Sequence, residues 1–189
     1  GDRHFVQCMH GVRLNGTCHD PAVHALATLA DAAHGAARVL AERHGDHTAL
    51  TAWMLGAGAG LKHQPDLVLL DFDGPGLHVL VDVKTFDTAG PTHINTHHTD
   101  RRRLGAHAAV VRRCEHDDYR IGQGPGLGPL PPGMRLVVFA VSTFGSFGRP
   151  ALKLLAEMGR RVGGGLPVSL LDEATWAAPR FAPFARMAI

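Results

Sequence analysis

The sequence is poor in cysteine, in aromatic side chains and in long apolar runs. It has three cysteines among 189 residues, an odd number that makes a poor disulfide framework and favours a reducing, intracellular setting. It has no run of about 18 apolar residues, which predicts that no segment spans a membrane. The sequence also lacks a large excess of either charge, because 19 basic and 17 acidic side chains give a formal net charge of only +2. Any basic surface for nucleic acid must therefore come from local clustering.

Apolar residues make up 45% of the chain, which is enough for the core of one compact domain. We expect a Cys/His-rich N-terminal arm over 1–19, a core domain over 20–165 and a C-terminal extension over 166–189. The predicted elements follow the order helix, strands, helix, strand, helix. That order predicts an α/β sandwich in which helices flank a central mixed sheet.

The clearest local pattern is a β-hairpin in the middle of the chain. Residues 66–72 and 77–84 are short, mostly apolar runs, and the four residues 73–76 between them have the chemistry of a turn. Both runs are apolar on both faces, which predicts that the hairpin lies inside a covered sheet.

Other elements are expected from caps and periodicity. Asp20-Pro21 should begin the first helix, because Asp is a favoured N-cap and Pro suits the first helical position. Residues 36–42 either continue this helix or form a first strand, and the strand is favoured after the break at Gly35. The remaining expectations are a glycine-containing loop over 45–64, a helix over 98–116, a strand over 135–142, an amphipathic helix over 149–161 and some helix around 170–176.

Two carboxylates and one ammonium group are expected to meet at one end of the hairpin. Asp82 and Lys84 point to the same face of a strand, because side chains at i and i+2 share a face. The hairpin brings Asp66 toward the end of the partner strand. Carboxylates of this kind suit Mg²⁺, which lowers the pKa of its bound water and neutralises charge on a phosphate. The pattern therefore predicts metal-dependent hydrolysis of a phosphodiester, with Lys84 acting on the attacking water or on the transition state.

Pro65-Asp66 followed by Asp82-Val83-Lys84 resembles the signature of the PD-(D/E)XK nuclease superfamily. The resemblance implies a restriction-endonuclease-like fold in which Asp66 and Asp82 bind Mg²⁺ or Mn²⁺. It further implies that the carbonyl of Val83 adds a ligand and that Lys84 is the third catalytic residue. DNA as the substrate is implied by the resemblance alone, and RNA stays open as an alternative.

A narrower resemblance concerns Val137–Gly148 and His19-Asp20. Both are similar to the restriction-like endonuclease domains at the C-terminal end of some non-LTR retroelement polyproteins. In those domains a Cys/His-bearing segment precedes the nuclease fold, as it does here through Cys8, His10, Cys18 and His19. This resemblance implies a nuclear location if the chain is part of a eukaryotic retroelement.

Further residues are candidates for the same site. The superfamily often supplies another acidic residue from the first helix or the next strand, and Glu42 is the candidate here. His63 and Gln64 directly precede the motif and could contact substrate. The best basic cluster for a phosphate backbone is formed by Arg101, Arg102, Arg103, Arg112 and Arg113. Cutting of one or both strands would depend on whether the chain forms a homodimer.

The motif also has simpler interpretations. Asp82 and Lys84 could form an ordinary ion pair on an edge strand, but a carboxylate inside an apolar run is costly unless it is paired or bound to metal. Asp71 and Asp73 lie by the turn and are expected to be solvated. Two other classes of protein stay open: a non-catalytic nucleic-acid-binding module with the same fold, and a structural zinc domain. Zinc would use Cys8, His10, Cys18 and His19, whose spacing is not that of a standard zinc finger.

Overall fold

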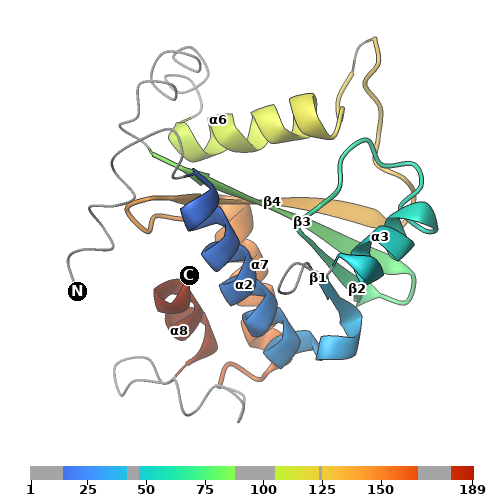
Figure 1. Cartoon of the computed structure of the whole chain (residues 1–189). Helices are drawn as coiled ribbons and strands as arrows, with labels where there is room; N and C mark the ends of the chain where they lie inside the picture. The colour runs from blue at the N-terminus through green and yellow to red at the C-terminus, as the bar shows by residue number, and fades with distance from the viewer. Residues whose placement is uncertain (1–14, 42–46, 88–104, 124, 166–179) are drawn as a thin grey trace.

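The computed structural model describes residues 15–41, 47–87, 105–123, 125–165 and 180–189. These residues form one four-stranded mixed sheet with helices on both faces, as Figure 1 shows. The predicted α/β class with a mixed central sheet is therefore confirmed. None of the helices in these ranges is long and apolar enough to cross a membrane.

The sheet has the order β1-β2-β3-β4, in which β1, β2 and β3 are antiparallel and β4 runs parallel to β3. The strands are β1 Val39–Ala41, β2 Leu67–Gly74, β3 Leu77–Phe86 and β4 Met134–Ser142. All four lie where the sequence predicts strands. The predicted four-residue turn of the hairpin is wrong in length, because Gly74 still pairs with Leu77 and only Pro75 and Gly76 connect the strands.

One face of the sheet is covered by α2 Asn15–His34, α7 Arg149–Arg161 and α8 Phe181–Ala188 (Figure 1). The bounds of α7 are those predicted, because its apolar residues recur at helical spacing and Pro150 suits its first turn. Odd-numbered strand residues fill this layer together with buried residues of the three helices. The main strand contributors are Leu67, Leu69, Val79, Val81, Val83, Val137 and Phe139.

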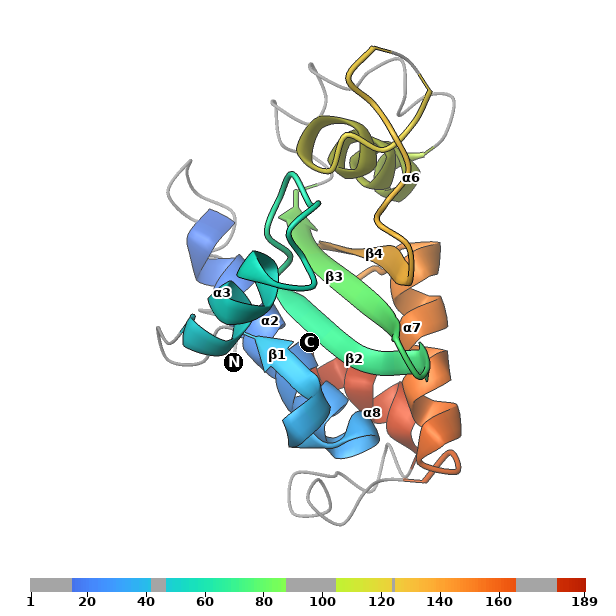
Figure 2. The same cartoon turned by 90° about the vertical axis from the view of Figure 1, so that its right-hand side faces the viewer.

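The opposite face is covered by α3 Thr48–Leu55 and by α6 Ala106–Arg113, which continues into a π-helical turn over Cys114–Asp118. Figure 2 shows α3 and α6 on this face, away from α7 and α8. The core of this layer contains Leu50, Val68, Leu80, Cys114, Tyr119 and Val138. Val68 and Leu70 of β2 and the even-numbered Leu80 of β3 therefore point toward α3 and α6, whereas Phe72, which follows the irregularity in β2, packs in the other layer.

The predicted start of the first helix is wrong. The helix begins at Asn15 and runs through Pro21, so Asp20 is not its N-cap. Pro21 lies inside the helix, in its second turn, where a residue with an N–H would donate to the carbonyl four residues earlier; the helix continues past it without that hydrogen bond. The carboxylate of Asp20 contacts His19 Nδ1 at 3.1 Å instead of capping the helix.

Two other predicted boundaries need correction. The loop expected over 45–64 contains α3, whose Leu50 is 1% exposed and so gains stability from burial. Of the helix expected over 98–116, residues 98–104 lie outside the described residues, and α6 begins at Ala106, after Gly105, whose φ of 83° an α-helix does not allow. The helix expected around 170–176 lies outside the described residues, whereas α8 was not predicted.

Candidate functional site

The pairing register of β2 and β3 places the two motif carboxylates opposite each other. Leu67 pairs with Val81, so the next position along each strand sets Asp66 across from Asp82. Residues directly opposite in an antiparallel pair share a face and lie close together. Lys84 is two positions further along β3 and shares that face. The structure therefore brings together Asp66, Asp82 and Lys84, on the side covered by α6.

Asp82 is the most deeply buried charged residue of the site, with a side chain that is 2% exposed. Its Oδ1 lies 2.9 Å from Lys84 Nζ. Its Oδ2 accepts no hydrogen bond from the described residues, although His63 Nε2 lies 3.4 Å away. Burial raises the pKa of Asp82 above its usual range, and the positive charge of Lys84 opposes that rise. The two oxygens of one carboxylate thus have different environments.

Lys84 bridges two carboxylates. Its Nζ is 2.9 Å from Asp82 Oδ1 and 3.1 Å from Asp118 Oδ2. Burial is the largest single effect and disfavours the charged ammonium, but the charge of Asp82 and the hydrogen bonds to Asp82 and Asp118 together outweigh it and hold the pKa of Lys84 above its usual range. Lys84 is therefore a cation and a hydrogen-bond donor at neutral pH.

Asp66 is held from two sides. Its Oδ2 accepts a 2.6 Å hydrogen bond from the backbone N–H of Val83 and lies 3.3 Å from His19 Nε2. The hydrogen bond to Asp66 is the main reason that the pKa of His19 rises to about 9, against the effect of burial, with Asp20 adding to the rise. His19 is therefore an imidazolium at neutral pH, and both of its ring nitrogens donate to carboxylates.

Asp118 and Tyr119 belong to this site and were not predicted from the sequence. The π-helical turn carries Asp118 to Lys84, and it carries Tyr119 to the ring of His63, where the centroids lie 5.2 Å apart in an edge-to-face arrangement. The hydroxyl of Tyr119 is buried without a hydrogen-bond partner among the described residues. A π-turn is a recurrent feature of functional sites. The only sequence signal was the acidic pair Asp117-Asp118, just after the helix expected over 98–116.

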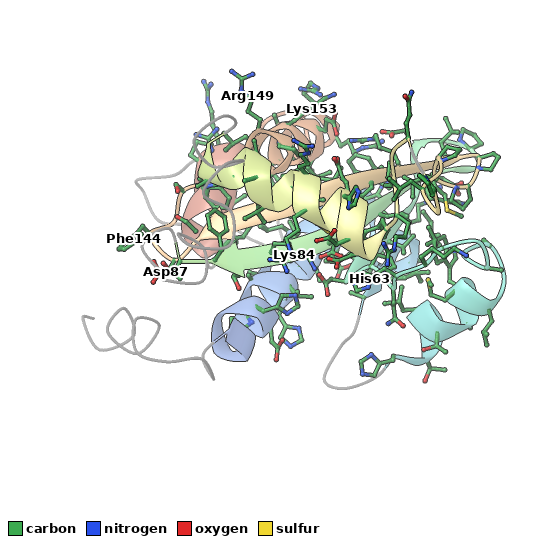
Figure 3. The ribbon with its side chains drawn as sticks, turned by 90° about the horizontal axis from the view of Figure 1, so that it is seen from above. His63, Lys84, Asp87, Phe144, Arg149 and Lys153 are labelled. Atoms are coloured by element: carbon green, nitrogen blue, oxygen red, sulfur yellow. The ribbon has the colours of Figure 1, made fainter. Side chains whose placement is uncertain are left out.

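The donor set fits a divalent cation. His63, Asp82 and Asp118 each offer one ligand atom, and these three atoms lie within 4.8 Å of one another. A buried carboxylate oxygen without a hydrogen-bond donor is rare in proteins, and a bound cation would satisfy it. Of the two predicted candidates at 63 and 64, His63 faces the carboxylates (Figure 3).

Several predicted residues lie elsewhere or outside the described residues. Glu42, Cys8 and His10 lie outside them, and so do Arg101, Arg102 and Arg103. Arg112 and Arg113 are exposed on α6, and Arg113 Nε lies 3.3 Å from Asp117 Oδ2. Asp71 and Asp73 are 44% and 38% exposed, in agreement with the expectation that they face solvent. Asp73 also pairs with Arg135, which the sequence did not indicate.

Comparison of the chain with known protein families, with curated proteins and with solved structures found no match. The resemblance to PD-(D/E)XK nucleases therefore stays a prediction that depends on the motif and on the geometry described above.

Proposed function

We propose that this chain is a divalent-metal-dependent nuclease of the PD-(D/E)XK type that hydrolyses DNA phosphodiester bonds. The observation that carries the proposal is the pairing of Asp66 opposite Asp82, with Lys84 Nζ 2.9 Å from Asp82 Oδ1. Burial of the Asp82 carboxylate is costly unless it is paired or bound to a cation, and it lies opposite a second carboxylate, that of Asp66. A restriction-endonuclease-like fold is part of this proposal and is compatible with the four-stranded mixed sheet.

In this proposal Asp66 and Asp82 hold Mg²⁺ or Mn²⁺, with the carbonyl of Val83 as a further ligand. The metal, when bound, lowers the pKa of a coordinated water and offsets charge on the phosphate. Val83 also has a role through its N–H, which fixes the orientation of the Asp66 carboxylate. Lys84 and His19 add two positive charges beside the carboxylates, and these favour an anionic substrate.

Two surface features offer room for nucleic acid. A pocket of ≈ 260 Å³ lies against Asp66 and is lined by His19, His24 and His63 among others, so imidazoles surround the approach to the site. A second pocket, of ≈ 380 Å³, lies between α6 and the start of α7 and includes Arg112 and Arg149 in its lining. We propose that the phosphate backbone contacts these arginines, since Arg is well suited to phosphate recognition.

The test is cleavage of supercoiled plasmid DNA in Mg²⁺ or Mn²⁺, with chelator as the blank. Asp82→Asn and Lys84→Ala change the site, and Lys153→Ala is the matched control, because Lys153 is 72% exposed on α7 and lies away from Lys84 (Figure 3). Loss of a residue that only supports a metal ligand typically costs about 10–100-fold in activity, and loss of a ligand or catalytic residue should cost more. We therefore expect at least about a hundredfold slower cleavage for both site variants and an unchanged rate for the control.

Circular dichroism would first establish that all variants are folded. Cleavage that persists in chelator, or equal rates for wild type, Asp82→Asn and Lys84→Ala, would contradict the proposal. DNA binding without any cleavage by the wild type would support a non-catalytic module with the same fold.

A further inference from the structure

We propose that His63, Asp82 and Asp118 form a second cation site, one that prefers a first-row transition metal such as Mn²⁺ over Mg²⁺. This site uses the face of Asp82 that points away from Lys84, and it includes a ring nitrogen that the PD-(D/E)XK motif does not contain. The site could bind a cation whether or not the protein cleaves DNA.

The first argument is the unused oxygen of Asp82. Lys84 contacts Oδ1, which leaves Oδ2 buried with no hydrogen-bond donor among the described residues. That oxygen lies 3.4 Å from His63 Nε2. One carboxylate oxygen of Asp82, one ring nitrogen of His63 and one carboxylate oxygen of Asp118 lie within 4.8 Å of one another. A buried carboxylate oxygen without a partner destabilises the protein, so a bound cation that satisfies it is favoured.

The second argument is the position of Asp118 in the π-helical turn. A regular continuation of α6 would rotate this residue to another position, whereas the π-helical turn over Cys114–Asp118 sets it beside β3. Such turns are rare and occur frequently at functional sites. Figure 3 shows His63 and Lys84 near each other beneath α6, so two separate elements bring their side chains to one place.

The site is accessible and has the charge that a cation needs. The side chains of His63 and Asp118 are 42% and 35% exposed, so an ion can enter and keep some of its water. Two carboxylates against one ammonium group, that of Lys84, leave a local excess of one negative charge. Attraction of a divalent cation follows from that excess.

The donor types decide which metal is preferred. Mg²⁺ is bound by oxygen ligands at near-ideal octahedral geometry. Imidazole is a good ligand for transition metals, and mixed nitrogen and carboxylate sites bind them in the order of the Irving–Williams series. The presence of His63 therefore predicts selection of Mn²⁺ over Mg²⁺, and stronger binding of Zn²⁺ or Co²⁺.

The experiment measures binding on metal-stripped, full-length protein. Calorimetric titration with MnCl₂ and with MgCl₂ gives the two affinities. Pulsed electron paramagnetic resonance of the Mn²⁺-loaded protein detects a coordinated ¹⁴N nucleus. His63→Ala and Asp118→Asn remove ligands, and His116→Ala is the control, because it removes a 56% exposed imidazole on the same turn as Asp118.

We expect His63→Ala to abolish the ¹⁴N signal and to weaken Mn²⁺ binding by at least about tenfold, because even an outer-shell change has that effect. Asp118→Asn should weaken Mn²⁺ binding to a similar extent. The protein molecules of this variant that still bind Mn²⁺ should keep the ¹⁴N signal, because His63 is unchanged. His116→Ala should leave both unchanged. A ¹⁴N signal that survives in His63→Ala, or one that is lost in His116→Ala, would overturn the inference.

Asp66→Asn separates this inference from the proposed function. The variant should lose plasmid cleavage if the nuclease proposal holds, while the ¹⁴N signal of the Mn²⁺-loaded protein persists. A wild type that shows the His63-dependent signal but never cleaves DNA would contradict only the nuclease proposal. Loss of the signal in Asp66→Asn but not in His63→Ala would place the metal beside Asp66 and overturn the second site.

Discussion

Lys84 Nζ lies 3.1 Å from Asp118 Oδ2, and this ion pair joins the centre of the sheet to the π-helical turn that follows α6. The two residues lie in separate elements of the chain, one in β3 and the other beyond α6. Because Lys84 also contacts Asp82 at 2.9 Å, a single ammonium group neutralises part of two carboxylates. The position of the turn over the sheet thus depends partly on the charges of the site.

Asp118→Asn tests how much this ion pair stabilises the protein in the absence of metal. Asp118 is 35% exposed and solvent screens the pair, so we expect the free energy of unfolding to fall by only about 0.5–1 kcal/mol. Urea unfolding in the presence of chelator measures the change. Asp117→Asn is the control on the same turn, since Asp117 is 51% exposed and surface changes usually stay within about 0.5 kcal/mol. A loss of several kcal/mol in Asp118→Asn would show that the carboxylate holds the turn in another way.

Tyr119→Phe should leave stability unchanged or raise it. The hydroxyl of Tyr119 is buried and makes no hydrogen bond of good geometry among the described residues. Burial, followed by the nearby carboxylate of Asp82, raises the pKa of Tyr119 far above its usual range. Phe keeps the edge-to-face contact with His63 and removes the unsatisfied hydroxyl, which costs roughly 1–3 kcal/mol when buried. We expect a gain of up to about 1 kcal/mol in urea unfolding. A loss of more than about 1 kcal/mol would show that a water or another group satisfies the hydroxyl.

The hairpin and α7 could be predicted because their signals are local. The apolar runs of β2 and β3 and the helical spacing of Leu152, Leu155 and Met158 depend only on neighbouring residues. Ala156, also expected on the apolar face, is exposed, and the buried Leu154 was not expected there. Convergence of Asp66, Asp82 and Lys84 followed from the same hairpin, because antiparallel pairing fixes which side chains share a face.

The contribution of the π-turn could not be predicted in this way. Asp118 reaches Lys84 only because α6 packs on the sheet and ends in a π-turn, and nothing in Cys114–Asp118 marks such a turn. The α3 helix was hidden by the glycines that follow it, and Leu50 is stabilised there by tertiary burial. Long-range packing decided both features, and a single sequence carries little information about it.

Arg135→Ala should lower the stability of the protein without changing the metal site. The guanidinium of Arg135 forms two hydrogen bonds to Asp73, at 2.7 and 3.0 Å, and one to Glu157 at 3.1 Å, so it links β4, the end of β2 and α7. Glu157 is 16% exposed and would lose a partner. We expect urea unfolding to show a loss of about 1–2 kcal/mol.

Arg135→Lys should recover only part of that loss, because an ammonium group cannot reproduce the planar fork that bonds Asp73 through two nitrogens. Neither variant should alter the affinity for Mn²⁺, since Arg135 pairs with Val79 in the sheet whereas Asp82 pairs with Val138. A weaker Mn²⁺ affinity in folded Arg135→Ala would mean that the hairpin transmits strain from its turn to the carboxylates. Full recovery by Lys would mean that charge alone, and not the shape of the guanidinium, holds β2 and α7 together.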